Sequence, residues 1–121
     1  MMPASYAQAY EYFAQQLEQL ERQVTVAQPD VAQIKAALVP IQQEFQHTVQ
    51  PLVLEPDEAV PRTVISRLTA CNTEINKHLR FLAMDISFLQ AARQPQTVQQ
   101  RQAQIRDRLQ RLITYARLEL G

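Results

Sequence analysis

The sequence predicts an all-α protein, an antiparallel four-helix bundle, from three observations. Large apolar residues recur every three or four positions along most of the chain, which is the spacing of one face of a helix. Prolines separate these periodic segments from one another. The only glycine is Gly121, so the tight turns that join β-strands would have almost no glycine to use. The length favours a single helical bundle domain, residues 1–121.

The first expected helix covers residues 5–26. Its large apolar residues are separated by four, three, four, three and four positions: Tyr6, Tyr10, Phe13, Leu17, Leu20 and Val24. Such a heptad seam is typical of a helix that packs along another helix. Pro29 separates this helix from the next, because proline disfavours helical geometry in the residue before it.

The second expected helix begins at Val31 and extends to about Leu52. Pro40 lies inside it, where the ring would meet the carbonyl of Ala36 and one backbone donor is missing, so we expect a kink there. The apolar seam keeps its phase across Pro40, which favours one kinked helix rather than two. Three further prolines predict a stiff, extended connection to the next helix: Pro51, Pro56 and Pro61.

The third expected helix, residues 62–93, is the longest. At 1.5 Å per residue it spans roughly 45 Å, against roughly 30 Å for each earlier helix, so it should overhang its neighbours, bend or meet a second subunit. The short break at residues 94–96 forces the fourth helix back along the third. Thr97 and Gln100 have the capping-box spacing that opens this last helix.

The third helix carries more apolar surface than one seam requires. Beside its main seam, Phe81, Met84 and Phe88 form a second ridge, also spaced by three and four, on a different side. Either the helix is central and covered by the others, or the ridge meets another chain, and the two can coexist. The rarity of large exposed apolar patches favours the central helix. The surplus length of the helix favours a homodimer or partner surface.

Four other residues of the third helix have side chains that could carry chemistry. Asp85 lies on the apolar arc, so we expect an arginine or tyrosine partner for its carboxylate. Asn72 occupies a seam position, where a polar residue commonly fixes register. Cys71 and His78 are two turns apart, about 10 Å along the axis, which is too far for both to bind one zinc ion. The sequence predicts no catalytic set, no metal site and no cofactor, and therefore not an enzyme.

Charge divides the chain into two halves. Residues 1–60 contain eight acidic and two basic residues, a net charge of −6, and residues 61–121 contain ten basic and four acidic residues, a net charge of +6. We expect the two helical hairpins to neutralise each other along their flanks. Arg101 and Arg108 flank the seam and should act within the bundle. Arg106, Arg111 and Arg117 are expected to point further outward, where they are candidates to meet an acidic protein surface.

Composition excludes several classes of protein. The single cysteine, Cys71, cannot form an intramolecular disulfide, which favours the cytoplasm over a secreted, disulfide-stapled scaffold. Apolar runs are too short to span a membrane, and no signal peptide is recognisable. A formal net charge of zero argues against a general nucleic-acid binder. A nucleic-acid regulator that uses the basic C-terminal hairpin stays open as an alternative.

Two stretches resemble a known family. Residues 72–94, NTEINKHLRFLAMDISFLQAARQ, and residues 104–115, QIRDRLQRLITY, are similar to the cyanobacterial PatD family of small helical proteins linked to heterocyst frequency. The resemblance implies a regulatory protein that binds the cell-division protein FtsZ and modulates its assembly. A self-association or adaptor module with an unknown protein partner is the alternative. The candidate partner or dimer contacts are Phe81, Met84, Phe88, Arg106, Arg111 and Arg117.

Overall fold

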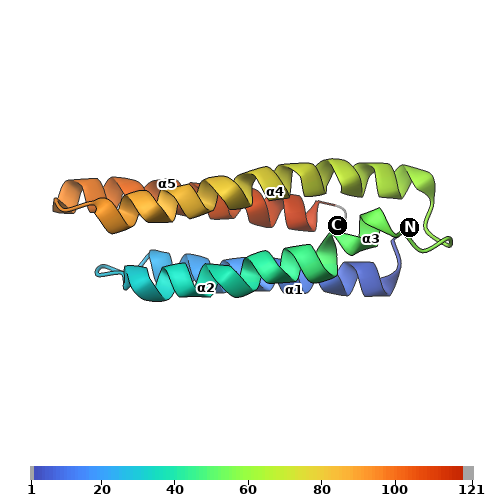
Figure 1. Ribbon diagram of the computed structural model, residues 1–121, viewed down its shortest axis with the longest axis horizontal. Helices are drawn as coiled ribbons and strands as arrows, with labels where there is room; N and C mark the ends of the chain where they lie inside the picture. The colour runs from blue at the N-terminus through green and yellow to red at the C-terminus, as the bar shows by residue number, and fades with distance from the viewer. Residues whose placement is uncertain (1, 119–121) are drawn as a thin grey trace.

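The computed structural model describes residues 2–118, and within them every regular element is a helix. Four long helices are present: α1 (Ala4–Val24), α2 (Val31–Glu44), α4 (Arg62–Ala91) and α5 (Pro95–Arg117). A π-helical turn, η1 (Phe45–Val49), and the short helix α3 (Pro51–Leu54) prolong α2 (Figure 1). The predicted all-α fold of four packed helices is confirmed. No helix within the described residues is long and apolar enough to cross a membrane.

The four long helices form a ring in which neighbours along the chain are also neighbours in space. α1 packs against α2 and α5, and α4 packs against the same two helices. Each long helix runs antiparallel to the one before it (Figure 1). This arrangement places the C-terminal half of α4 beside the N-terminal half of α5, because residues 92–94 are the only connection between them.

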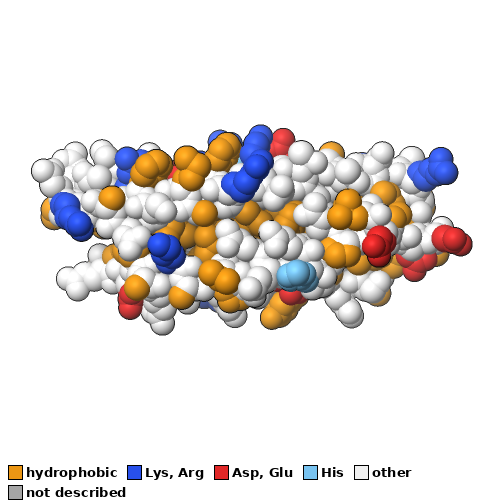
Figure 2. Space-filling model, viewed as in Figure 1, with side chains coloured by type: hydrophobic (Ala, Val, Ile, Leu, Met, Phe, Trp, Pro, Cys, Tyr) orange, Lys and Arg blue, Asp and Glu red, His pale blue; other side chains and the backbone are white. Residues whose placement is uncertain are grey.

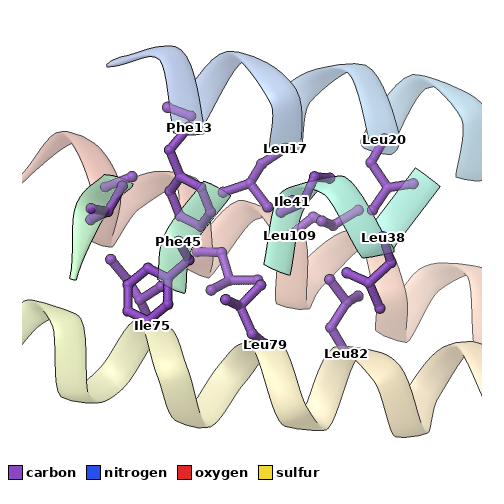
Figure 3. Packing of buried hydrophobic residues seen from close by; sticks show 14 of the residues in the cluster. Phe13, Leu17, Leu20, Leu38, Ile41, Phe45, Ile75, Leu79, Leu82 and Leu109 are labelled. Atoms are coloured by element: carbon purple, nitrogen blue, oxygen red, sulfur yellow. The ribbon is translucent and has the colours of Figure 1, made fainter. Parts of the chain in front are cut away.

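The core lies between the helices, where the heptad seams meet. All six apolar seam residues of α1 are buried, and each of the other long helices contributes buried apolar residues at the same spacing, such as Ile34, Leu82 and Ile105. The rings of Phe13 in α1 and Phe45 in η1 lie 5.7 Å apart, centroid to centroid. Figure 3 shows these two rings directed toward each other, with Ile75 and Leu79 of α4 on the far side of Phe45. Removing this apolar surface from water stabilises the bundle.

The second helix is interrupted at η1 rather than at Pro40. The α-helical segment α2 continues through Pro40, where the kink was predicted. The departure from α-helical geometry comes later, where the backbone N–H of Gln50 donates to the carbonyl of Phe45 at 2.8 Å. The wider π-helical turn lies directly before Pro51, whose ring in a regular α-helix would meet the carbonyl of His47.

Each helix of the α4–α5 hairpin begins at a proline. Pro61 is the N-cap of α4, and Pro95 is the first residue of α5. The last helix therefore begins two residues before Thr97, and the capping box predicted at Thr97 and Gln100 is wrong. Proline suits this position because its fixed φ matches the helix and its missing N–H would have had no partner there.

The connection between α3 and α4 is held against the start of α1. The hydroxyl of Tyr6 donates to the carbonyl of Leu52 at 2.8 Å and accepts from the backbone N–H of Asp57 at 3.0 Å. Together, α2, η1 and α3 form a helical run over residues 31–54 that accompanies α4 along much of its length (Figure 1). The 30 residues of α4 therefore lie along the bundle, and the predicted overhang is not needed to accommodate them.

Candidate functional site

The C-terminal half of α4 has two apolar faces. Leu82, Ile86 and Leu89 are buried in the core. Phe81, Met84 and Phe88, which we call the α4 ridge, are exposed by 39 %, 52 % and 45 %. Figure 2 shows hydrophobic side chains along the upper edge of the molecule, with Lys or Arg side chains among them. The interpretation in which the other helices cover the α4 ridge is therefore wrong.

Two arginines of α5 pack on the aromatic rings of the α4 ridge. The Cζ atom of Arg108 lies 5.0 Å from the centroid of the Phe81 ring, and that of Arg101 lies 4.8 Å from the centroid of the Phe88 ring. Both distances are within the range of a cation–π interaction. Arg101 and Arg108 are half-buried, so they fix the outward position of the rings from the α5 side.

Arg108 is held in place by the buried carboxylate of Asp85. Its Nε donates to Oδ2 of Asp85 at 2.9 Å, which confirms the arginine partner expected for this carboxylate. Its Nη1 lies 3.1 Å from Nδ1 of His78. Asp85 is 8 % exposed. The buried side of Arg108 is thus bound by two α4 side chains, while its guanidinium plane covers Phe81.

The contacts of His78 favour its neutral form. An arginine can only donate, so the contact of Nδ1 with Arg108 favours a neutral ring with its proton on Nε2, which lies 3.7 Å from Oε2 of Glu74. Burial lowers the pKa of His78, and the positive charges of Arg108 and Lys77 lower it further. The ring stacks on Tyr115 of α5 at 5.8 Å and meets Phe81 edge-on at 6.1 Å. His78 is therefore packed between α4 and α5.

A shallow groove of about 480 Å³ runs beside the α4 ridge. It is lined by one acid of α4 and by five polar residues of α5: Asp85, Arg101, Gln104, Asp107, Arg108 and Arg111. Arg111 thus joins the ridge residues on one surface, which we call the α4–α5 face. It comprises the α4 ridge and this groove.

Arg106 and Arg117 lie elsewhere. Arg106 lines a separate hollow with residues of the turn that follows α1, including Val26. Arg117 makes hydrogen-bonded ion pairs with two acids of α1, at 2.7 Å to Glu11 and 2.9 Å to Glu18. The hydrogen bonds from Arg117 hold the pKa of both carboxyl groups below the usual range. The expected outward position of Arg117 is therefore wrong, and its pairing is an instance of the charge neutralisation expected between the two hairpins.

Two residues of the α4–α5 face were not predicted from the sequence to belong to it. Arg101 and Arg108 were expected to flank the seam and act within the bundle, as Arg108 does through Asp85, but both also contact the exposed ridge. A signal for them exists in the chain. Phe81 and Arg108 lie at equal sequence distances from the break between residues 94 and 95, and so do Phe88 and Arg101. In an antiparallel hairpin such residues face each other.

The remaining reactive side chains do not gather into a second site. Cys71 and His78 are buried, and His47 is exposed on η1. Within residues 2–118, no three His, Cys, Asp or Glu side chains are grouped so that they could hold a metal ion. The α4–α5 face is therefore the candidate functional site.

Comparison with known proteins replaces the family suggested by the sequence pattern. Residues 13–117 match the model of a family described as the CRR41 C-terminal domain. Neither the curated proteins nor the solved structures include a match to the chain. The PatD resemblance is wrong, and the expectations of FtsZ binding and heterocyst control lose their basis with it. Leucine- and arginine-rich helical spacing recurs in unrelated bundles, because any amphipathic helix on a helical core requires it.

Proposed function

The chain belongs to the CRR41 C-terminal domain family, and we propose that this member is a non-enzymatic domain that binds another protein through its α4–α5 face. One observation carries the proposal. Three large apolar side chains are exposed in line on one helix, although the same helix already buries a complete seam. Contiguous apolar surface with a polar rim is typical of protein interaction sites. The chain has a single cysteine, the buried Cys71, and therefore forms no disulfide within itself, which agrees with the cytoplasm as the proposed location.

Self-association through the same face is less favourable. In a two-fold contact between two α4 ridges, Phe81 of one copy would lie near Phe88 of the other. The arginines that cover these rings, Arg108 and Arg101, would then approach each other across the contact. Like charges brought together in this way oppose association. We therefore propose a different protein, rather than a second copy, as the partner.

Nucleic acid is also a poorer partner than protein. Two arginines of the basic C-terminal hairpin already form ion pairs within the domain. Arg108 binds Asp85, and Arg117 binds Glu11 and Glu18. Asp107 adds a further negative charge to the groove. Phosphate backbones select surfaces with an excess of unpaired positive charge, and the pairing here reduces that excess.

Site-specific photo-crosslinking tests the proposal. A photoreactive amino acid replaces Met84 in the full chain, produced in its native cells, and a matched variant carries it at Val39 of α2. The two positions are exposed to a similar degree, by 52 % and 49 %. We expect a discrete adduct with another protein from position 84, lost when Phe88→Ala is added, and none from position 39. Equal adducts from both positions, no adduct from position 84, or an adduct with a second copy of this chain would each overturn the proposal.

A further inference from the structure

On the premise of the proposed function, we infer that the partner segment is an amphipathic α-helix with an apolar stripe and acidic flanks. Its apolar stripe would cover the α4 ridge, and its carboxylates would reach the arginines of the adjoining groove. The shape and the charge of the α4–α5 face both indicate this chemistry for the partner.

The shape of the face suits a helix. Phe81, Met84 and Phe88 are spaced by three and four, so they form one raised row along two turns of α4, roughly 10 Å long. The groove lies alongside this row. A raised row beside a groove is the surface into which a second helix packs its own rows of side chains. Apolar anchors at this spacing are the contacts an amphipathic helix makes with its receptor.

Three arginines and two aspartates line the groove, and this small excess of positive charge favours acids on the partner. Arg101 donates to Gln104 at 3.0 Å, and among the described residues neither Arg101 nor Arg111 has a carboxylate within 4.0 Å. Of the two acids that line the groove, Asp85 is already bound by Arg108. A partner that covers the ridge also removes water from Arg101, and a carboxylate on that partner compensates the loss.

The positions of the arginines set the spacing of these acids. Arg101 and Arg111 are ten residues apart on α5, which corresponds to about 15 Å along the helix axis. Two carboxylates about ten or eleven residues apart on a docked helix span the same distance and lie on the same side of it. A second copy of this chain lacks such a pair on α1, because Arg117 already binds both Glu11 and Glu18.

A designed peptide pair tests the inference. The probe is a fluorescent 21-residue peptide with Leu at heptad positions a and d, Glu at b and e, which places acids ten and eleven residues apart on one flank, and Ala or Gln elsewhere. The control peptide has Lys in place of each Glu. Binding to the full chain is measured by fluorescence anisotropy at low and at about 0.5 M salt. We expect the Glu peptide to bind at least tenfold more tightly than the Lys peptide, with the difference reduced at high salt.

Two arginine variants identify the surface. Arg101→Gln removes a guanidinium from the groove beside the α4 ridge and should weaken binding of the Glu peptide severalfold. Arg106→Gln removes an exposed charge from the α1 side of the same helix and should leave binding unchanged. Equal binding of both peptides, no binding of either, an equal effect of the two variants, or tighter binding of a labelled DNA duplex would overturn the inference. The crosslinking result at position 84 then decides independently whether the face binds a protein at all.

Discussion

Arg108 of α5 and Asp85 of α4 are joined across the hairpin by a hydrogen-bonded ion pair, 2.9 Å from Nε to Oδ2. The Asp85 side chain is 11 % exposed and that of Arg108 is 25 % exposed, so water screens this pair only in part. The pair connects the core to the α4–α5 face, because the same guanidinium group covers Phe81. The interior of the hairpin therefore controls the geometry of the surface that we propose to be functional.

Replacing Asp85 should destabilise the domain. Asp85→Ala leaves the half-buried guanidinium of Arg108 without its carboxylate, and we expect the free energy of unfolding to fall by about 1–3 kcal/mol. Urea denaturation measures the change. Asp107→Ala is the matched control, because Asp107 lines the same groove but is exposed, and it should change stability by less than about 0.5 kcal/mol. Equal effects of the two substitutions would contradict a structural role for the Asp85–Arg108 pair.

The core could be predicted from the sequence because its signal is local and periodic. Tyr6, Phe13 and Val24 repeat at the helical spacing, and burial of one helix face requires that repeat whatever the neighbouring helix is. The helix boundaries were predictable for a similar reason, since Pro61 and Pro95 restrict their own backbone and that of the preceding residue. The competing signal at Thr97 was weaker, because the fixed φ of a proline already suits the first position of a helix.

Contacts between distant residues could not be predicted in the same way. Arg117 binds Glu11, 106 positions earlier, and nothing in the spacing of either residue specifies that contact. The helical phase of Arg117 shows only that it lies off the core seam, which is equally true of a solvated arginine. The α4 ridge was visible as a pattern, but whether another helix covers it depends on how the helices are arranged around the core. Only the structure shows how the helices are arranged around the core.

Lowering the pH should reduce the stability of the domain through protonation of His78. The pKa of this ring in the folded state lies below its ordinary value of about 6.5, so the unfolded chain binds the proton more tightly. Stability due to the neutral ring is fully present above about pH 6.5 and is lost as the pH falls toward the folded-state pKa. One proton limits the slope to about 1.4 kcal/mol per pH unit. Urea denaturation between pH 7.5 and 5 should show this loss.

Two histidine variants separate the contribution of His78 to the pH dependence of stability from that of the other ionisable groups. His78→Gln removes the titrating group while keeping an oxygen that can accept from Arg108, so the stability of this variant should vary less with pH over that range. His47→Gln changes an exposed residue of η1 and should leave the pH dependence as it is in the unmodified chain. An unchanged pH dependence in His78→Gln would show that His78 is not its source.

A second acid-sensitive contact joins the first and last helices, α1 and α5. The pKa values of Glu11 and Glu18 are lowered by Arg117, so their contribution is fully present above about pH 4.5 and is lost as the pH falls through the lower folded-state values. These side chains are more than a third exposed, so we expect Arg117→Gln to cost only about 0.5–1 kcal/mol at pH 7. Thermal unfolding at pH 7 and pH 3 should show that the cost disappears in acid. A cost that persists at pH 3 would assign it to packing of the arginine side chain instead.

The buried pair of Tyr10 and Asn72 should behave as one unit. The hydroxyl of Tyr10 donates to Oδ1 of Asn72 at 2.7 Å, and the amide nitrogen Nδ2 of Asn72 has no hydrogen-bond partner among the described residues. Tyr10→Phe leaves both polar atoms of the amide without a partner and should cost about 1–2 kcal/mol. The double variant Tyr10→Phe, Asn72→Leu removes the polar group as well and should recover most of that loss in chemical denaturation. A double variant less stable than Tyr10→Phe alone would show that Asn72 stabilises the core by some other contact.

Substitutions at two adjacent residues of α4 should separate effects on stability from effects on binding. Leu89 is 2 % exposed, and Leu89→Ala leaves a cavity that we expect to cost about 2–5 kcal/mol. Phe88 is 45 % exposed, and Phe88→Ala removes mainly its contact with Arg101, which should cost less than about 1 kcal/mol. Binding of the Glu-containing peptide should show the opposite order, because Phe88 lies on the α4 ridge and Leu89 in the core. Urea denaturation and fluorescence anisotropy of both variants, the latter below their unfolding transitions, measure the two effects. If Phe88→Ala destabilises the domain as much as Leu89→Ala, the ridge belongs to the fold and the α4–α5 face loses its assignment as a binding surface.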